Sequence, residues 1–351
     1  MNLFSSEQVT KYHPDKYADQ ISDAILTECL RQDKKSHVAC ETMVKNDTVI
    51  IAGEITTSGD IDYEGIVRKV GSDLNYKVGN VINLITKQSP EINRAVESDA
   101  KQGAGDQGMM YGYAVKGQDY LPYGFYLANR FTKALEKATV KDGILKGDAK
   151  VQVTVNLPDN GSYGLGTPES VNTILVSVCH KEGYSLDYIR DYVTSIISKV
   201  DYRVVDYANL IINPSGLWTF GGPSADCGLT GRKIVCDQYG GYAPVGGGAF
   251  SGKDPSKVDR SGAYMARKIA CAVIDEFEVN KCQIQLAYGI GIAEPLSVNV
   301  STDGSANLDK YISKWIKSNY DLTPYGIIRY LDLLNLDYYK IAGGCHMTHF
   351  M

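Results

Sequence analysis

The sequence lacks the hydrophobic segments that membrane and secreted proteins carry. Its first residues, MNLFSSEQVT, show neither the basic stretch nor the apolar core of a secretory signal. No run of roughly 18 or more apolar residues, the length that predicts a membrane helix, occurs anywhere. We therefore expect a cytoplasmic protein that has no membrane partner.

Paired cysteines and an excess of basic residues are also missing. The 8 cysteines include no C-x-x-C pair, which favours free thiols over a disulfide framework. The formal net charge is -5, whereas nucleic-acid-binding proteins usually carry a basic excess, so we expect no nucleic-acid partner. Cys345, His346 and His349 could contribute to a zinc site, but a full ligand set is not found nearby, and an ordinary terminal segment is the alternative.

What is present is a regular alternation of strand and helix patterns. The 351 residues are enough for two or three packed units. Apolar periodicity predicts three strand pairs, 37–44 with 48–55, 149–156 with 171–178, and 282–290 with 296–301. It predicts helices over 15–32, 185–199 and 259–277. The pattern indicates an α+β protein built of three similar α/β layers, each with one sheet face free to pack against a partner chain.

The densest chemistry lies between Gly221 and Arg260, in the runs GGPSADCGLTGRK and GGGAFSGKDPSKVDR. Glycines allow backbone N–H groups to approach a phosphate closely. Four cations and three carboxylates share the two runs: Arg232, Lys233, Lys253 and Lys257, with Asp226, Asp254 and Asp259. This mixture is typical of a site for a metal–polyphosphate complex.

Two other interpretations of this segment stay open. The run from Gly247 to Lys253 fits the spacing of a P-loop, but Asp254 follows where a Ser or Thr should ligate Mg²⁺. The nearest expected strand, about Lys233–Asp237, is also separated from that run by a glycine-rich stretch. The third interpretation is a glycine-rich surface turn with solvated charges.

Two smaller groups of residues suit phosphate or metal binding. His13-Pro14-Asp15-Lys16 stands at an expected helix start, where the positive end of the helix favours anions. His13 could equally cap the helix or pack against it. Asp148-Ala149-Lys150 stands at a strand start, where a solvent-facing polar edge is the simpler interpretation.

Taken together, these runs resemble the S-adenosylmethionine synthetase (methionine adenosyltransferase) family. The motifs occur in the family's order: KYHPDKYADQISDAIL, ACETMV, GEITTS, KQSPEI, GAGDQG, DAKVQV, the two glycine-rich runs, YGIGIAEP and LTPYGII. They cover nearly the whole chain, and GAGDQG and GGGAFSGKDPSKVDRS are long and specific.

The resemblance implies an enzyme that joins L-methionine to ATP. The methionine sulfur attacks ribose C5′ and displaces the triphosphate, which is then hydrolysed to pyrophosphate and phosphate. A thioether carries no proton that must be removed, so the reaction needs no Ser-His or Cys-His nucleophile. Its barrier lies in alignment and in leaving-group charge, for which cations are suited.

The resemblance also assigns roles to individual residues. The catalytic group that holds the phosphates is His13, Lys150, Arg232, Lys233 and Lys253. The rest of the ATP site is Asp148, Leu217, Trp218 stacked on adenine, Asp226, Ala249 and Ile290. The methionine site is Glu54, Gln88, Asp106, Asp226 and Lys257. The metal ligands are Asp15 and Asp259 for Mg²⁺, with two ions per site, and Glu41 for K⁺.

For the architecture, the resemblance implies three similar domains around a pseudo-threefold axis, which we place at 2–91, 104–218 and 220–346. Two chains pair by their sheet faces and share their active sites, and two such dimers can form a tetramer. Residues 89–103 resemble the family's mobile gate.

The chain departs from the family pattern at Tyr12, where glycine is usual, and at Leu217-Trp218, where Arg-Phe is common. The stretch 61–87 and the C-terminus after Gly343 are shorter than usual. These two shortenings bear on the tetramer more than on the chemistry. Beside an active synthetase, two rival hypotheses are a non-catalytic nucleotide-binding subunit and a P-loop-like ATPase.

Overall fold

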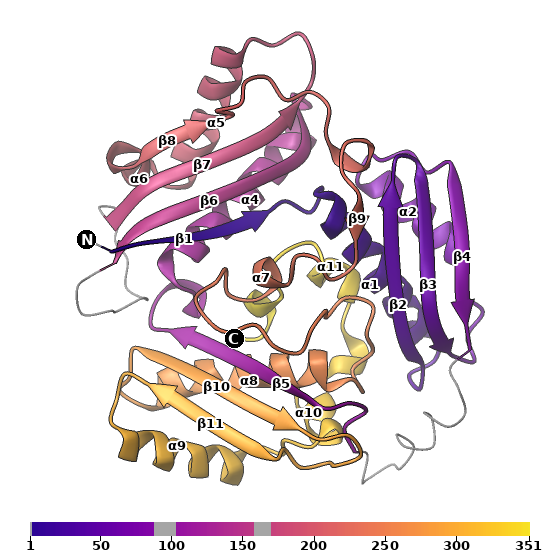
Figure 1. The fold of residues 1–351 in the computed structure, drawn as a ribbon, viewed down its shortest axis with the longest axis vertical. Coiled ribbons are helices and arrows are strands. Elements are labelled where there is room, and N and C mark those ends of the chain that lie inside the picture. The colour runs from indigo at the N-terminus through magenta and orange to yellow at the C-terminus, as the bar shows by residue number, and fades with distance from the viewer. Residues whose placement is uncertain (1, 88–102, 158–169) are drawn as a thin grey trace.

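Three small sheets lie around a common centre in the computed structural model, which describes residues 2–87, 103–157 and 170–351 (Figure 1). The first sheet has the order β4-β3-β2-β9, from Asn80–Thr86, Thr48–Thr56, His37–Lys45 and Gly228–Leu229. The second has the order β1-β6-β7-β8, from Asn2–Val9, Leu145–Leu157, Val171–His180 and Asn209–Ile212. The third has the order β11-β10-β5, from Ser297–Thr302, Lys281–Tyr288 and Gly108–Val115.

Each sheet contains one predicted strand pair, which confirms the three α/β layers and the α+β class. The pairs are antiparallel, with Ala39 opposite Glu54, Gln152 opposite Leu175 and Gln285 opposite Asn299. Each sheet also takes a strand from a distant part of the chain, namely β9, β1 and β5. The sequence pattern did not indicate these three exchanged strands.

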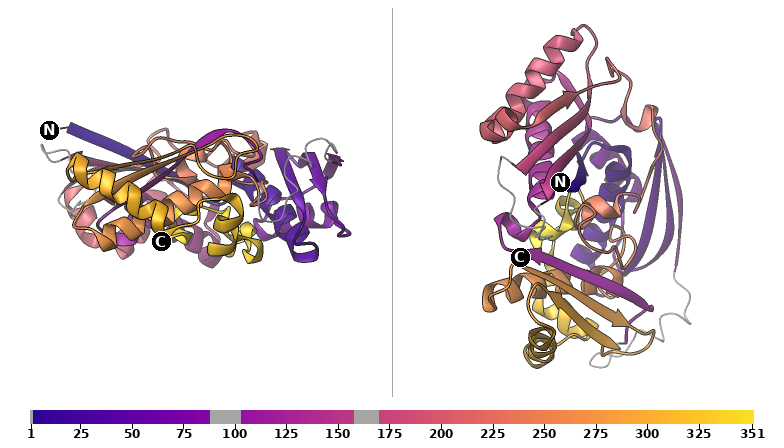
Figure 2. Two further views of the ribbon diagram at one scale, coloured as in Figure 1. Left: turned by 90° about the horizontal axis from the view of Figure 1, so that it is seen from below. Right: turned by 60° about the vertical axis from the view of Figure 1, so that its left-hand side comes forward.

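One face of each sheet is covered by helices. Helix α1 (Pro14–Gln32) packs on β2, α4 (Tyr123–Asp142) on β6, and α8 (Val258–Glu276) on β5 and β10. The other α-helices among the described residues are α2 (Tyr63–Asp73), α5 (Leu186–Val200), α6 (Tyr202–Tyr207), α7 (Ile234–Asp237), α9 (Ala306–Asn319), α10 (Pro324–Tyr330) and α11 (Tyr338–Ile341). The edge-on view in Figure 2 shows how thin the molecule is across these layers.

The predicted helices 15–32, 185–199 and 259–277 are confirmed to within a residue as α1, α5 and α8. Their starts follow ordinary capping chemistry. Pro14 occupies the first turn of α1, and the Ser185 hydroxyl accepts a hydrogen bond from the Tyr188 N–H at the start of α5. None of the described helices combines the length and hydrophobicity that crossing a bilayer requires.

The expected strand over Lys233–Asp237 is wrong, because residues 234–237 form the short helix α7 instead. The Asp237 N–H bonds to the Lys233 carbonyl at 2.9 Å, which closes a helical turn. Consecutive residues, Cys236 and Asp237, are buried here, whereas a strand would bury alternate ones. Ile234 and Val235 are β-branched, which locally favours a strand, but tertiary packing overrides this preference.

Candidate active site

A row of buried carboxylates on α1 holds the glycine-rich segment in place. Asp15, Asp19 and Asp23 are spaced by four residues, so they project from one face of the helix. Each accepts one backbone N–H, from Leu229 at 2.9 Å, Gly231 at 2.8 Å and Gly252 at 2.8 Å respectively. Both halves of the segment are therefore fixed to one rigid element, a relation that motif matching alone did not reveal.

The first half places two cations beside Asp15. Lys233 Nζ lies 2.5 Å from Asp15 Oδ2, and Arg232 Nε lies 3.9 Å from Oδ1. Burial acts to raise the pKa of Asp15, but the hydrogen bonds from Lys233 and from the Leu229 N–H outweigh it and lower the pKa. Asp15 is thus an ionised carboxylate among cations, as a Mg²⁺–phosphate site requires.

His13 caps α1 and presents a neutral ring. Its Nδ1 accepts a hydrogen bond from the Asp15 N–H at 3.1 Å, so the ring proton is on Nε2. Burial, followed by the charges of Lys233 and Lys150, lowers the pKa of His13 to about 3. The capping and phosphate-binding interpretations of His13 are therefore compatible, because the capped ring still has Nε2–H available as a donor.

The second half of the segment is tied to β2 by its backbone. The Cys40 N–H donates to the Gly252 carbonyl at 2.9 Å. Gly252 has φ +81°, and a Cβ placed there would lie 1.8 Å from the Cys40 carbonyl oxygen, so only glycine fits. Next to it, the Lys253 amine pairs with the carboxylate of Asp259 at the start of α8. Lys253 and Asp259 thus form the second cation–carboxylate pair of the site.

Asp254 anchors the same loop and decides against the P-loop interpretation. Its Oδ2 accepts from the Val38 N–H at 2.7 Å and pairs with Lys257 Nζ at 2.5 Å. Asp254 is fully engaged in holding the loop rather than pointing at a metal. The described element that precedes the loop is α7, not the strand that a P-loop needs.

The residues expected near adenine come from the second sheet. The Asp148 Oδ2 accepts a hydrogen bond from the Gly222 N–H at 2.8 Å, and burial raises the pKa of Asp148 to about 6. The Trp218 backbone pairs with His180, and its indole N–H donates to the Phe220 carbonyl at 2.8 Å. Leu217 and Lys150 are exposed at the same end of the sheet.

Other expected residues lie on different sheets. Ile290, which is 61% exposed, sits beside the GAGDQG run, because Ala104 exchanges backbone hydrogen bonds with Gly291 and Ile292. Asp106 is exposed in that run. Glu41 and Glu54 stand on the open face of the first sheet, and Glu54 is opposite Ala39, which bridges to Lys253. Ala249 fills the space above Gly231.

Part of the expected site lies outside the described residues. This part comprises Gln88 and residues 89–102 of the gate expected at 89–103. Asp226 is exposed between the Gly222 turn and β9. In the part of the chain that is described, Glu54, Lys257 and Lys253 are brought to one end of β2. Trp218 and Ile290 lie instead in segments beside the second and third sheets.

Tyr12, where the family usually has glycine, fits into space left by Gly147. Its ring lies against Gly147, where a Cβ would be 2.4 Å from the ring. Its carbonyl accepts a hydrogen bond from the Tyr76 hydroxyl at 2.5 Å. The two tyrosines and Asp148 line a cavity of about 700 Å³ behind the Gly221–Gly222 turn.

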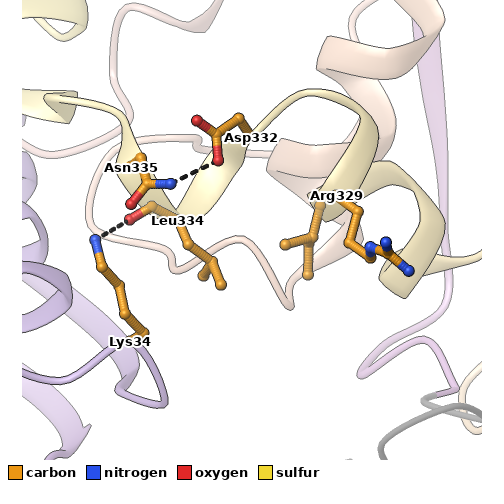
Figure 3. Close-up of a pocket in the computed structure, with 6 residues that line it drawn as sticks. Lys34, Arg329, Asp332, Leu334 and Asn335 are labelled. Carbon is orange, nitrogen blue, oxygen red and sulfur yellow. Dashed lines mark hydrogen bonds between the residues drawn. The ribbon is translucent and has the colours of Figure 1, made fainter.

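A smaller hollow of about 330 Å³ lies between the α1–β2 turn and the C-terminal region (Figure 3). The Lys34 amine donates to the Leu334 carbonyl at 2.8 Å, and the Asn335 amide donates to Asp332 at 2.6 Å. These polar groups are bonded to one another and do not converge on the hollow. The hollow therefore differs from the glycine-rich segment, where several cations gather.

The candidate metal ligands of the site are its carboxylates, and the cysteine and histidines near the C-terminus do not gather around a common point. No cluster of three or more His, Cys, Asp or Glu side chains suited to a metal occurs among the described residues. Cys345 Sγ donates to the Gln238 carbonyl, and His346 Nδ1 bonds to the Tyr264 hydroxyl, so neither faces a common ion. Single carboxylates such as Asp15 and Asp259 suit Mg²⁺, which binds through one or two carboxylates together with substrate phosphates.

Comparison with known proteins matches the whole chain to one family. Models of the N-terminal, central and C-terminal domains of S-adenosylmethionine synthetase match residues 1–100, 101–218 and 220–350. The S-adenosylmethionine synthase of Helicobacter hepaticus is 44% identical, over 98% of this chain and 92% of the relative. That of Nitratiruptor sp. is 42% identical over the same shares.

A solved structure supports the same assignment. An unusual S-adenosylmethionine synthetase from Campylobacter jejuni superposes with a TM-score of 0.88 at 32% identity, over 98% of this chain and 94% of that one. The fold, the motif order and the full-length matches agree: the chain belongs to the S-adenosylmethionine synthetase family, the methionine adenosyltransferases.

Proposed function

We propose that the glycine-rich segment and α1 form the site where ATP and L-methionine become S-adenosylmethionine. The observation that carries this proposal is the anchoring of Lys233 and Lys253, on two separate loops, to one row of buried carboxylates. Such preorganised cations stabilise charge that develops on a departing polyphosphate. The sulfur lone pair forms the S–C5′ bond while the C5′–O bond breaks, and the triphosphate leaves with that electron pair.

Each residue then has a physical role. The His13 Nε2–H donates to the oxygen that leaves C5′, and Lys150, Arg232, Lys233 and Lys253 hold the triphosphate, which is next hydrolysed to pyrophosphate and phosphate. Lys257 meets the methionine carboxylate and Asp226 its ammonium group. Glu54, Gln88 and Asp106 complete the methionine pocket; Asp148, Leu217, Trp218, Ala249 and Ile290 surround the adenosine.

For the metals, we propose Mg²⁺ at Asp15 and Asp259, with two ions per site, and K⁺ at Glu41. Asp15 and Asp259 fit this assignment because each already faces a lysine at the phosphate site. A Mg²⁺ ion held by these carboxylates would supply positive charge next to the phosphates. Glu41 is exposed on the open face of the first sheet, and its match to the family's motif is what supports this assignment.

For the assembly, we propose a homodimer that pairs through the open sheet faces and shares its active sites. The first sheet exposes an apolar row, in which Leu229 neighbours Met43, Ile50 neighbours Met43 and Ile82, and Leu84 neighbours Ala52. A contiguous apolar patch of this kind marks an interaction surface. It adjoins Glu41 and Glu54, so a second chain on this face would reach the site.

Three finer points belong to the same proposal. First, the partner's copy of the third sheet would bring Ile290 to the adenine. Second, two dimers could pair as a tetramer. Third, the domains divide at 2–91, 104–218 and 220–346. A cytoplasmic location fits the 8 free thiols, seven of which are buried.

Replacement of Lys253 tests the assignment. We expect Lys253→Ala to lower kcat by roughly a hundredfold or more, because one charge-stabilising contact contributes a few kcal/mol in the transition state. The measurement is S-adenosylmethionine formation and phosphate release by purified protein with Mg²⁺ and K⁺. Lys314→Ala, which removes an exposed lysine of α9, is the matched control and should be unchanged.

The outcomes separate the rival functions. Normal turnover by Lys253→Ala would refute the assigned role. Nucleotide binding without product by the unmodified protein would favour a non-catalytic subunit, and methionine-independent cleavage of ATP to ADP would favour an ATPase.

A further inference from the structure

The C-terminal segment reaches the catalytic loop through fully buried polar side chains. His346 lies in the segment, Tyr264 and Arg260 on α8, and Asp23 on α1; each is 0% exposed. His346 Nδ1 is 2.7 Å from the Tyr264 hydroxyl, which is 3.2 Å from Arg260 Nη1. Arg260 Nη2 is 2.5 Å from Asp23 Oδ1. These contacts form a continuous path from the C-terminus to α1.

The direction of each hydrogen bond in this path follows from its chemistry. A guanidinium can only donate, so the Tyr264 oxygen accepts from Arg260. The same oxygen could also accept from a protonated Nδ1, but the buried Tyr264 proton would then have no acceptor among the described residues. The hydroxyl therefore donates to Nδ1, and the ring proton is on Nε2. Burial lowers the pKa of His346 well below its ordinary value, which keeps the ring neutral, as this arrangement requires.

The path ends at the backbone of the loop that carries Lys253. Asp23 Oδ1, held by Arg260, also accepts the Gly252 N–H at 2.8 Å. Arg260 Nε donates in addition to the Phe250 carbonyl at 2.9 Å. The two residues that flank Ser251 are thus both fixed by groups in the path, immediately before Lys253.

The other side of the His346 ring faces the other loop. His346 Nε2 is 3.8 Å from Asp237 Oδ1, too far for a hydrogen bond, so the ring N–H meets this carboxylate by a longer electrostatic contact. Asp237 in turn pairs with Lys16 Nζ at 2.5 Å. Lys16 also pairs with Asp19 at 2.9 Å, and Asp19 accepts the Gly231 N–H, directly before Arg232 and Lys233. One imidazole therefore lies between the polar groups that fix the two phosphate-binding loops.

We propose that His346 is a positioning residue, which sets the geometry of both loops through these two paths without touching substrate. The proposal rests on the proposed function, since it needs Lys233 and Lys253 to act on the triphosphate. Displacement of such groups by as little as an ångström lowers turnover strongly, whereas the binding of methionine depends on other side chains.

Two matched tyrosines test the path. Tyr264 and Tyr338 are both fully buried and both pack against Arg260, with ring centroids 5.8 and 4.4 Å from its guanidinium carbon. The Tyr264 hydroxyl is part of the path, whereas the Tyr338 hydroxyl donates to the Leu333 carbonyl outside it. Tyr264→Phe and Tyr338→Phe therefore each remove one buried hydroxyl and keep the ring.

We expect Tyr264→Phe to lower kcat roughly tenfold or more with little change in the KM for methionine, and Tyr338→Phe to leave kcat within about twofold. Hydrogen exchange at the Gly252 amide should accelerate only in Tyr264→Phe. Should that variant fail to fold, His346→Gln, which keeps a polar group, should retain more turnover than His346→Ala.

A nitrogen-15 NMR spectrum supplies a separate readout, in which His346 should be neutral with its proton on Nε2. Equal kcat in the two tyrosine variants, or a proton on Nδ1, overturns the proposal. If Lys253→Ala is inactive while Tyr264→Phe is normal, only the positioning role fails; normal turnover by Lys253→Ala removes the proposed function itself.

Discussion

The close approach of Gly252 to β2 allows a sharp test of how the phosphate loop is held. An alanine at this position meets two separate obstacles. Its φ of +81° costs a residue with a Cβ about 1–2 kcal/mol, and the Cβ would collide with the Cys40 carbonyl oxygen at 1.8 Å. A backbone atom cannot rotate away, so the loop must leave the strand.

The second obstacle has a magnitude that follows from the bonds it breaks. Moving the loop loses the Cys40 N–H bond to the Gly252 carbonyl, worth about 1 kcal/mol, and the Gly252 N–H bond to the Asp23 carboxylate, worth about 2 kcal/mol. Together with the backbone strain of about 1–2 kcal/mol, we expect Gly252→Ala to lower the free energy of unfolding by about 4–5 kcal/mol and to reduce kcat, because Lys253 moves with the loop.

Gly183 is the matched control. It has φ +91°, but nothing lies within 4 Å of a Cβ placed there. Gly183→Ala should therefore show only the strain of about 1–2 kcal/mol, with kcat unchanged. The assay is denaturant unfolding at fixed protein concentration, alongside product formation. Equal destabilisation of the two variants, or an unchanged kcat in Gly252→Ala, would refute the reasoning.

Two further predictions concern buried charge. Because the pKa of His13 is lowered to about 3 from 6.5, the folded state disfavours its protonation, and this contribution to stability is present above pH 6.5 and lost as pH falls toward 3. When the pH is lowered from 6.5 to about 4, the free energy of unfolding should fall less in His13→Gln than in the unmodified protein. Denaturant titrations at the two pH values measure this difference, and equal falls would contradict the prediction. Lys16→Met leaves Asp19 and Asp237 without their shared cation, and we expect a loss of about 3–5 kcal/mol in chemical unfolding. A loss under about 1 kcal/mol would mean that the pair is solvated or protonated.

Local patterns predicted a large part of the fold. The alternation of Val151, Val153 and Val155 identified β6, and the apolar stripe of 259–277 identified α8, because both are fixed by which side chains face the core. The exchanged strands were not predictable in this way. Whether Asn2–Val9 pairs with β6 depends on contacts more than a hundred residues away, which no local window contains.

Chemistry and motif together predicted which of the site's charged side chains lie close to one another, while their roles stay a prediction. Lys233, Lys253, Asp15 and Asp259 meet as cation–carboxylate pairs, as the metal–polyphosphate interpretation requires. The supporting groups were missed, although the spacing of Asp15, Asp19 and Asp23 was visible in the sequence. Acidic residues four apart are common on solvent-facing helices, so their spacing alone does not indicate burial.

The exchange of strands between the sheets has a consequence for how the chain is made. The first sheet is complete only when Gly228–Leu229 pairs with β2. In the third sheet, β5 has no partner until β10, which begins at Lys281, has been synthesised. A chain emerging from the ribosome therefore holds unpaired strand edges until most of it has been synthesised. Separating the three domains would leave each sheet without one of its strands. We therefore expect the domains to fold together and to unfold together.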